Sequence, residues 1–387
     1  MDREQCITLL ERLEAVPDPR HARGKRYEWR VILAILCAGL ISGQPMVWGI
    51  VDWARHHGRE IIELLEIRKR RIPSASTFYW VLRHVGIARL EAEIAALGLA
   101  VQAAGCAGEG VRLAHGEVVH GQAVDGKDVR GARAHGAGLY LVSLACHESG
   151  IVLNEGQVDA KTNEITVVPE LLAGRDLHGV VVTMDALLAQ RKIAQQILNQ
   201  GGDYLMVVKG NQRQLCQAID LVFEAPPLCQ GEEERLKYSQ QQKAHGRRET
   251  RTLETSALLN EYLGWPGAQQ VLRRTYHAVD LQSGAVRHKV THGVTSLSRQ
   301  RAGPKQLEAL WRGHWTIENC EHYVRDETFG EDRCQLHTGN APQAMAALRN
   351  GVLNTLRYLG WHSIPAAFRH YGASVHDALR AVGALAT

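Results

Sequence analysis

Two aspartates occupy positions from which they could take part in chemistry. Asp125 follows Gln122-Ala123-Val124 and precedes Gly126, and Asp185 closes the apolar stretch 180–184, VVVTM. A continuous apolar run predicts a strand at the centre of a sheet, and a charge at its end lies at the edge of a site or is poorly solvated. We expect Gly126 to let the chain turn, so that Asp125 also stands at a strand end. One such aspartate is ordinarily a solvated turn or a helix cap, but two in one α/β segment predict converging carboxylates.

A third carboxylate, Glu318, lies in a helical pattern with unusual companions. Trp311, His314, Glu318 and Arg325 follow one another at spacings of three, four and seven residues. These spacings put the four residues on one face of an α-helix. The alternative, a ladder of surface salt bridges, predicts polar neighbours rather than Trp311 and Trp315. We therefore expect this face to belong to a site.

The three carboxylates have no Cys-X-X-Cys or His-Glu-X-X-His pattern beside them, which favours a hard cation. Oxygen ligands suit Mg²⁺ or Mn²⁺, and two such ions about 4 Å apart can activate a water and stabilise the leaving oxygen in phosphodiester cleavage. Without a dication, converging carboxylates would raise one another's pKa. The alternative is a zinc site, although the spacing of its four ligands fits no common pattern: Cys320, His322, Cys334 and His337.

The composition is that of a globular protein with more than one domain. The chain has 387 residues, of which 45 % are hydrophobic and 22 % charged, and this excludes a disordered, collagen-like or coiled-coil protein. The formal net charge of +4 is too small to indicate a nucleic-acid partner by itself. The eight cysteines form no Cys-X-X-Cys pair, and residues 1–4 do not resemble the start of a signal peptide. Both observations favour a reducing cytoplasm.

The pattern of apolar residues divides the chain into four parts. Residues 1–110 read as helical throughout, including the uncharged stretch 31–51, which is long enough to span a bilayer. Because Ser42-Gly43-Gln44-Pro45 predicts a turn inside this stretch, we expect two buried helices there. In 111–215 strands alternate with helices, the α/β pattern. Residues 216–303 predict a mainly β insertion, with strands near 249–254, 270–280 and 286–296, and 304–387 return to helix.

The sequence resembles bacterial insertion-sequence transposases of the DDE type, in the branch of the H-repeat-associated proteins of Rhs elements. The matching stretches run in order through nearly the whole chain: DPRHARGKRYEW (18–29), AVDGKDVRG (123–131), VDAKTNEITVVPELL (158–172), VVTMDALLAQRKIAQQI (181–197), GGDYLMVVKGNQ (201–212), HGRRETR (245–251), RGHWTIENCEHYVRDETFGEDR (312–333) and TGNAPQAMAALRN (338–350).

The resemblance implies an α/β fold with an RNase H-like catalytic core, made of 111–215 and 304–387, that is interrupted by the mainly β insertion and preceded by an all-α domain. It implies that Asp125 and Asp185 are the metal-binding aspartates and Glu318 the closing glutamate, with two Mg²⁺ or Mn²⁺ ions as the cofactor. His314 and Arg325 stand where related transposases commonly place Arg and Lys. We expect both to contact phosphates of the scissile strand.

The chain departs from the branch at two places. After Ile317-Glu318-Asn319 the branch usually has an apolar residue before a His-aromatic pair, whereas this chain has Glu321. Leu336 and His337 stand where more basic residues are expected. Neither departure touches the three carboxylates.

Clustered Lys and Arg side chains mark a DNA-binding face even when the net charge is small. The run 68–71 precedes a helix-start signal at 73–77 and a predicted helix at 78–84, which resembles the entry of a helix-turn-helix element. A charge run can equally be a solvated surface. The side chains expected to contact DNA are Lys127, Arg130, Lys209, Arg312, His314, Arg325, Arg68, Lys69, Arg70, Arg71, Arg247 and Arg248.

The sequence therefore predicts a transposase that binds the terminal inverted repeats of its element as double-stranded DNA, cuts phosphodiester bonds and joins the freed 3′-hydroxyl to target DNA. We expect a homodimer or larger assembly on DNA, in the cytoplasm at the nucleoid, with no role for a membrane. Two alternatives stay open. One is a catalytically silent DNA-binding or regulatory protein derived from a transposase, and the other is a nuclease without strand transfer.

Overall fold

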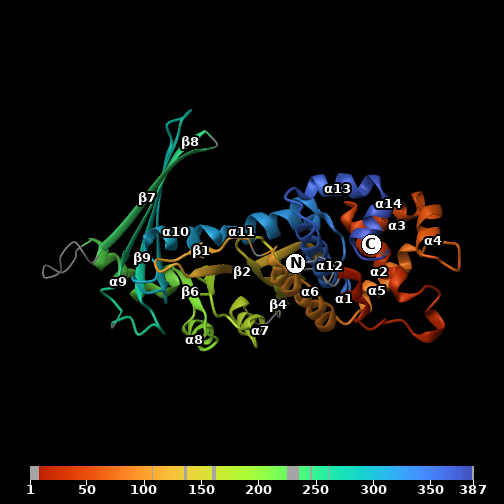
Figure 1. Ribbon diagram of the computed structural model, residues 1–387, viewed down its shortest axis with the longest axis horizontal. Helices are drawn as coiled ribbons and strands as arrows, with labels where there is room; N and C mark the ends of the chain where they lie inside the picture. The colour runs from red at the N-terminus through yellow and green to blue at the C-terminus, as the bar shows by residue number, and fades with distance from the viewer. Residues whose placement is uncertain are drawn as a thin grey trace. The chain divides into compact units, whose positions relative to one another are not determined.

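The computed structural model describes residues 8–106, 108–134, 137–158, 163–224, 235–244, 246–260 and 262–385 (Figure 1). The chain forms two compact units. The helical unit contains Met1–Gly108, Gly126–Asn163 and Thr316–Thr387, and the sheet unit contains Glu109–Asp125 and Glu164–Trp315. This division differs from the expected four parts, because the N-terminal helices share a unit with segments from the middle and the end of the chain.

The helical unit is built mainly from helices at the two ends of the chain. The N-terminal ones are α1 (Leu9–Glu14), α2 (Trp29–Ile41), α3 (Val47–His56), α4 (Gly58–Leu64), α5 (Ala75–His84) and α6 (Ile87–Val101), with short turns at Ala22–Gly24 and Gln102–Cys106. The C-terminal ones are α12 (Ala341–Tyr358), α13 (Ile364–Ala373) and α14 (Val375–Ala381). Residues Val31–Ile41 of α2 are all buried, and Gly43 turns the chain before α3 with a φ of 79°. The expectation of two helices in 31–51 is confirmed, and the first is buried, whereas α3 buries one face and leaves Trp48 exposed. None of the described helices is long and apolar enough to cross a membrane.

A strand pair packs against these helices within the same unit. Strands β3 (Ala137–Cys146) and β4 (Val152–Gln157) pair antiparallel. The side chain of Asn354 in α12 covers the backbone of β4. Its oxygen accepts a hydrogen bond from the Val152 N–H at 2.9 Å, and its nitrogen donates one to the Val152 carbonyl at 2.8 Å. Gly98 of α6 allows the close approach, since a Cβ there would lie 2.3 Å from the Val152 carbonyl oxygen. These contacts cover the backbone of β4 that would otherwise be exposed.

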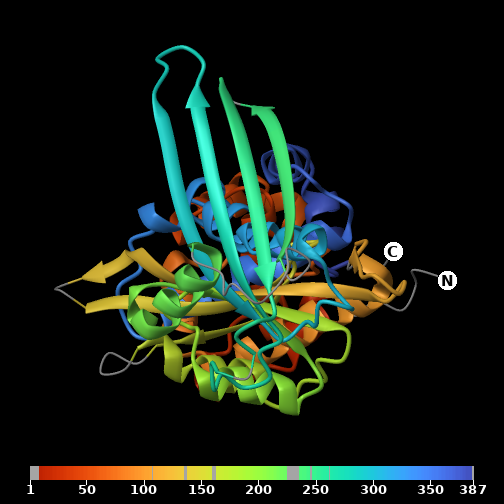
Figure 2. The ribbon, with the colours of Figure 1, turned by 90° about the vertical axis from the view of Figure 1, so that its left-hand side faces the viewer.

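The sheet unit contains a large mixed sheet. Its strands are β1 (Val111–Arg112), the first part of β2 (Val118–Ala134), β5 (Val180–Met184), β6 (Asp203–Val208), β7 (Arg235–Ala244), β8 (Arg247–Ser256), β9 (Gln270–Asp280) and β10 (Val286–Thr295). The order is β2-β5-β6-β10-β9-β8-β7, with β1 beside β2. Strands β2, β5 and β6 are parallel, and the other pairs are antiparallel. Figure 2 shows the four long strands β7–β10 lying side by side.

The strands predicted between 216 and 303 are confirmed, but they do not form a compact unit of their own. Strand β10 pairs with β6, with Val294 opposite Met206 and Gly293 opposite Val207. The insertion therefore continues the sheet begun by β2, β5 and β6. Pairing between segments so far apart in sequence leaves no mark in the local apolar pattern.

Four helices accompany this sheet within the unit. They are α7 (Val168–Leu172), which follows a short turn at Glu164–Thr166, α8 (Arg191–Asn199), α9 (Arg213–Glu224), which follows a turn at Gly210–Gln212, and α10 (Pro304–Gly313). Arg274 of β9 fixes α10, because its guanidinium makes two hydrogen bonds of 2.8 and 2.7 Å to Glu308 and lies 5.7 Å from the ring centre of Trp311. Trp311 is buried against β10 at Gly293.

Replacing Gly293 by alanine tests how α10 is seated. A Cβ at this position would lie 2.7 and 2.8 Å from two ring carbons of Trp311, so the ring and the helix would have to move. We expect Gly293→Ala to lower the free energy of unfolding by about 1–3 kcal/mol in urea denaturation. The control is Gly24→Ala, because no atom lies within 4 Å of a Cβ at Gly24. Equal stability of the two variants would contradict this packing.

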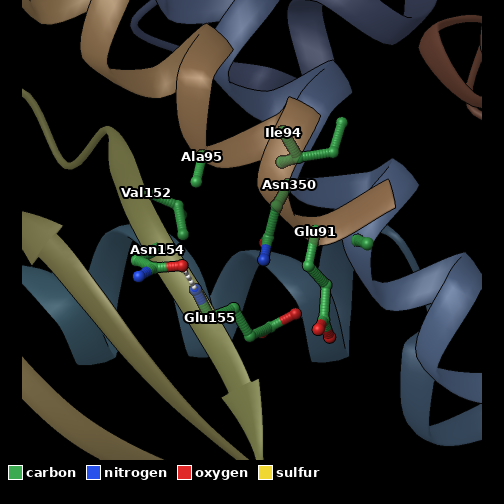
Figure 3. Close-up of a pocket in the computed structure, with 8 residues that line it drawn as sticks. Glu91, Ile94, Ala95, Val152, Asn154, Glu155 and Asn350 are labelled. Carbon is green, nitrogen blue, oxygen red and sulfur yellow. Dashed lines mark hydrogen bonds between the residues drawn. The ribbon is translucent and has the colours of Figure 1, made fainter. Parts of the chain in front are cut away.

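A small cavity in the helical unit lies between α6, β4 and α12 (Figure 3). Its volume is about 10 Å³, and its lining includes Glu91, Asn154, Glu155 and Asn350. Burial and the charge of Glu155 together raise the pKa of Glu91 to about 7, although a hydrogen bond from Gln343 opposes the shift. Glu91 is therefore held in its neutral form in the folded protein at mildly acidic pH.

This shift predicts a pH dependence of stability. A carboxyl whose pKa is higher in the folded than in the unfolded state favours folding at low pH, and this contribution is lost as pH rises from about 4.5 to about 7. We expect Glu91→Gln, which cannot ionise, to remove up to about 3 kcal/mol of this dependence. Urea denaturation at pH 5 and pH 8 would measure it, with the exposed Glu60→Gln as the control. An unchanged pH dependence in Glu91→Gln would exclude a raised pKa at this position.

Candidate functional site

Asp125 and Asp185 stand at corresponding positions of two adjacent parallel strands in the sheet unit. Val124 of β2 pairs with Met184 of β5, so the two aspartates follow directly paired residues. Neighbouring strands lie about 5 Å apart, and directly opposed residues of a parallel pair point to the same side of the sheet. The two aspartates, both partly buried, therefore stand next to paired residues at the same level of the sheet.

The strand-end prediction is confirmed for Asp185 and is wrong for Asp125. Strand β5 ends at Met184, whereas β2 continues through Gly126 to Ala134. The later part of β2 pairs with β3, and this pairing keeps the chain extended where the glycine suggested a turn. Asp125 thus lies in the middle of a long strand.

Lys209 lies beside Asp185 and balances its charge. Strand β6 ends at Val208, and the Lys209 ammonium donates hydrogen bonds of 2.9 and 3.2 Å to the two carboxylate oxygens of Asp185. Partial burial alone would raise the pKa of Asp185, but Lys209, the Ala186 amide and the nearby His314 together lower it. Asp185 is therefore ionised at neutral pH, next to a half-exposed cation.

His314 joins this group from the end of α10. Its Nδ1 lies 3.0 Å from the Oγ1 of Thr183, a buried residue of β5 two positions before Asp185. Because Trp311 and Glu308 anchor the same helix on β9 and β10, the imidazole is held close to Asp185. The sequence predicted His314 here, but nothing in the sequence pointed to Thr183.

The helical pattern that contains Glu318 changes its pitch. After α10 come α11 (Trp315–Ile317), π-helical turns at Glu318–His322 and Val324–Thr328, and a short turn at Glu331–Arg333. In a π-turn the hydrogen bond joins residues i and i+5, so each residue turns less about the axis than in an α-helix. The side chain of Glu318 is 49 % exposed while that of Arg325 is fully buried. The prediction that both lie on one face is wrong for this reason.

Arg325 is the centre of a buried charge network in the helical unit. Its guanidinium donates to Glu321 at 2.7 Å and to the two oxygens of Glu331 at 3.0 Å each, and it also pairs with Glu155 of β4. Arg349 of α12 donates to Glu331 from the other side at 3.0 Å. The guanidinium of Arg325 therefore faces buried carboxylates inside the protein. The expected contact of Arg325 with a DNA phosphate is therefore corrected to a structural role.

Lys127 belongs to the same network. Its side chain is only 4 % exposed, and the ammonium pairs with Asp326 and lies 3.9 Å from Glu331. A buried and paired ammonium cannot reach a phosphate without giving up these partners, so the expected DNA contact of Lys127 is also corrected.

His322 is a residue whose place beside Glu318 the sequence reading missed. Its Nδ1 lies 3.5 Å from a carboxylate oxygen of Glu318, and its Nε2 lies 2.9 Å from Glu321. The spacing of four residues from Glu318 could have predicted this neighbourhood, because residues i and i+4 of a helix lie on one face. The sequence analysis placed His322 only in the alternative zinc site. Among the described residues, Cys320, His322, Cys334 and His337 do not form a cluster.

The other basic residues expected to bind DNA are accessible. Arg130 is 73 % exposed and lies 3.9 Å from Asp332. Arg312 and Arg248 are exposed and Arg247 is partly buried. The run Arg68, Lys69, Arg70 and Arg71 is exposed in the segment between α4 and α5, and the predicted helix after it is present as α5.

Two family descriptions match the chain. “Transposase DDE domain” matches residues 120–355, a range that contains Asp125, Asp185 and Glu318, and “DDE_Tnp_1-associated” matches residues 10–96. The first match covers more than half of the chain.

Curated relatives carry corresponding names. “Putative transposase YncI” of Escherichia coli O157:H7 is 28 % identical over 353 residues, which is 90 % of this chain and 87 % of that protein. “H repeat-associated putative transposase YhhI” of Escherichia coli (strain K12) is 30 % identical over 221 residues, 56 % of this chain and 58 % of that protein. A cryo-EM structure of a piggyBac transposase synaptic complex with hairpin DNA overlaps 96 % of this chain and 76 % of that chain, with a TM-score of 0.43 and 10 % identity. An overlap this weak defines neither fold nor function. The family matches and the named relatives do define the family, and the chain belongs to the DDE transposases, with H repeat-associated proteins among its relatives.

Proposed function

We propose that this chain is an active transposase, which cuts DNA at the ends of an insertion sequence and joins the freed ends to target DNA. The observation that carries the proposal is the pair of carboxylates at corresponding positions of β2 and β5, inside the range that matches the transposase family. In the proposal, Asp125, Asp185 and Glu318 together hold Mg²⁺ or Mn²⁺, with two ions as the expected number.

The residues in the sheet unit fit a divalent cation. Asp125 and Asp185 offer only oxygen ligands, which hard cations prefer. Two adjacent carboxylates repel each other, and Lys209 neutralises only one of them. A bound dication would supply the larger compensating charge, lower the pKa of a water and stabilise the leaving oxygen of a phosphodiester.

The protein's own side chains would then bind and orient the DNA. Lys209 and His314 lie beside Asp185, where a scissile phosphate would need positive charge and hydrogen-bond donors. Arg130, Arg312, Arg247, Arg248 and the run 68–71 would contact phosphates further along the duplex. Because two element ends must be paired before joining, we also propose that the protein acts as a dimer or larger assembly on DNA, in the cytoplasm at the nucleoid.

Cleavage of a labelled linear DNA that carries the element's terminal sequence tests the catalytic role of Glu318. We expect wild type to cut at the terminus with Mg²⁺ or Mn²⁺ and not with a chelator, and Glu318→Gln to lose cutting by at least a hundredfold while still shifting the DNA in a gel. The matched control is Glu327→Gln, which alters another exposed carboxylate of the same helical run and should cut normally.

The outcomes separate the remaining functions. Normal cutting by Glu318→Gln would overturn the assignment of the third carboxylate. Wild type that binds the ends but never cuts would instead support a catalytically silent regulatory protein. Cutting without joining of the 3′-hydroxyl to a second DNA would indicate a plain nuclease.

The exposed cations are tested by the salt dependence of DNA binding. Removing a side chain that neutralises one phosphate lowers the slope of log affinity against log salt concentration by about 1. We expect this change for Arg248→Ala, because Arg248 is exposed on β8 opposite Lys243 of β7. Arg369→Ala, which removes an exposed arginine of α13, is the control. Equal slopes for the two variants would remove Arg248 from the DNA interface.

A further inference from the structure

The imidazole ring of His322 lies between a buried carboxylate and a half-exposed one. On the Nε2 side, Glu321 is 2.9 Å away and fully buried. On the Nδ1 side, Glu318 is 3.5 Å away and half-exposed. The ring is thus fixed from the interior of the helical unit while its other nitrogen faces an accessible carboxylate.

Glu321 is itself held rigidly. One of its oxygens accepts hydrogen bonds from Arg325 at 2.7 Å and from Ser143 of β3 at 3.2 Å. Arg325 is fixed in turn by Glu331 and Glu155. The carboxylate that faces His322 therefore has little freedom to follow a different ring orientation.

We propose that His322 is a further metal ligand, which binds through Nδ1 beside Glu318, and that Glu321 is its positioning residue. The inference rests on the proposed function, since it concerns the ion that Glu318 would hold. Metal-binding histidines almost always donate their second ring N–H to a carboxylate or carbonyl, which fixes the tautomer and raises the basicity of the ligating nitrogen. The Nε2 atom lies 2.9 Å from a carboxylate oxygen of Glu321, so an N–H on Nε2 could be donated there while Nδ1 faces Glu318.

The spacing of the two ligand atoms agrees with this assignment. Neighbouring ligands of an octahedral ion with bonds of about 2.1 Å lie about 3 Å apart, close to the 3.5 Å between Nδ1 and the Glu318 oxygen. Because imidazole suits transition metals better than Mg²⁺, His322 would shift the preference of the site towards Mn²⁺.

Binding of Mn²⁺ alone to the full-length protein tests the proposal without an activity assay. We expect pulsed EPR of bound Mn²⁺ to show coupling to a ¹⁴N nucleus in wild type and to lose it in His322→Gln, with at least tenfold weaker Mn²⁺ affinity by calorimetry. The control is His376→Gln, because His376 also lies beside a carboxylate, 3.7 Å from Asp377, but both side chains are exposed. Glu321→Gln should retain the nitrogen coupling and bind Mn²⁺ more weakly than wild type.

The results distinguish this inference from the proposed function. If wild type binds Mn²⁺ with an affinity that depends on Glu318 but shows no nitrogen coupling, His322 is not a ligand, and the three-carboxylate site stands. If wild type binds no Mn²⁺, both proposals fail. A coupling that persists in His322→Gln would assign the nitrogen to another residue. Should His322→Gln not fold, the presence or absence of coupling in wild type still decides the outcome.

Discussion

The burial of the Arg325 charge is the constraint on which the helical unit depends. A guanidinium with no exposed surface must be matched by carboxylates with good geometry, because the desolvation cost is otherwise uncompensated. The partners come from β4, from the π-helical turns and from the turn after them, and Arg349 links this group to α12. Removing one partner of such a network costs about 3–5 kcal/mol. The segment that carries Glu318 is therefore tied to both the strands and the helices of its unit.

The pKa values of the carboxyl groups in this network are shifted in opposite directions. Burial raises the pKa of Glu155, and although Arg325 opposes the shift, the neighbouring Glu321 and Glu331 add to it. Burial would also raise the pKa of Glu331, but Arg325 and Arg349 together lower it. The pKa of Glu155 is thus raised and that of Glu331 lowered, although Arg325 contacts both carboxyl groups. Asp185 of the sheet unit differs, because it is ionised and Lys209 balances it at the surface.

Local sequence patterns predicted the helices and strands of this fold better than they predicted which strands pair with one another. The turn at Gly43, the helix at α12 and the apolar strand before Asp185 each depend on residues close in sequence, and all three are present. The continuation of β2 past Gly126 and the return of β10 to β6 depend on pairing with distant strands, which a single strand does not encode. Arg325 was misjudged for a similar reason. Its charge suggested a surface role. Two of its buried partners, Glu321 and Glu331, lie four and six residues away, but the third, Glu155, comes from the distant strand β4, and the burial of the guanidinium depends on that packing.

The π-helical turns after Ile317 set the directions in which the side chains of this segment point. Each such turn holds one more residue per hydrogen-bonded ring than an α-turn, and the difference accumulates between Glu318 and Arg325. If these turns took the pitch of an α-helix without any change in length, the spacing of seven would bring the two side chains onto one face. Either the carboxylate would then be drawn inward or the guanidinium would be expelled from its acidic partners. The helical pitch of this stretch therefore matters as much as the chemical types of its residues.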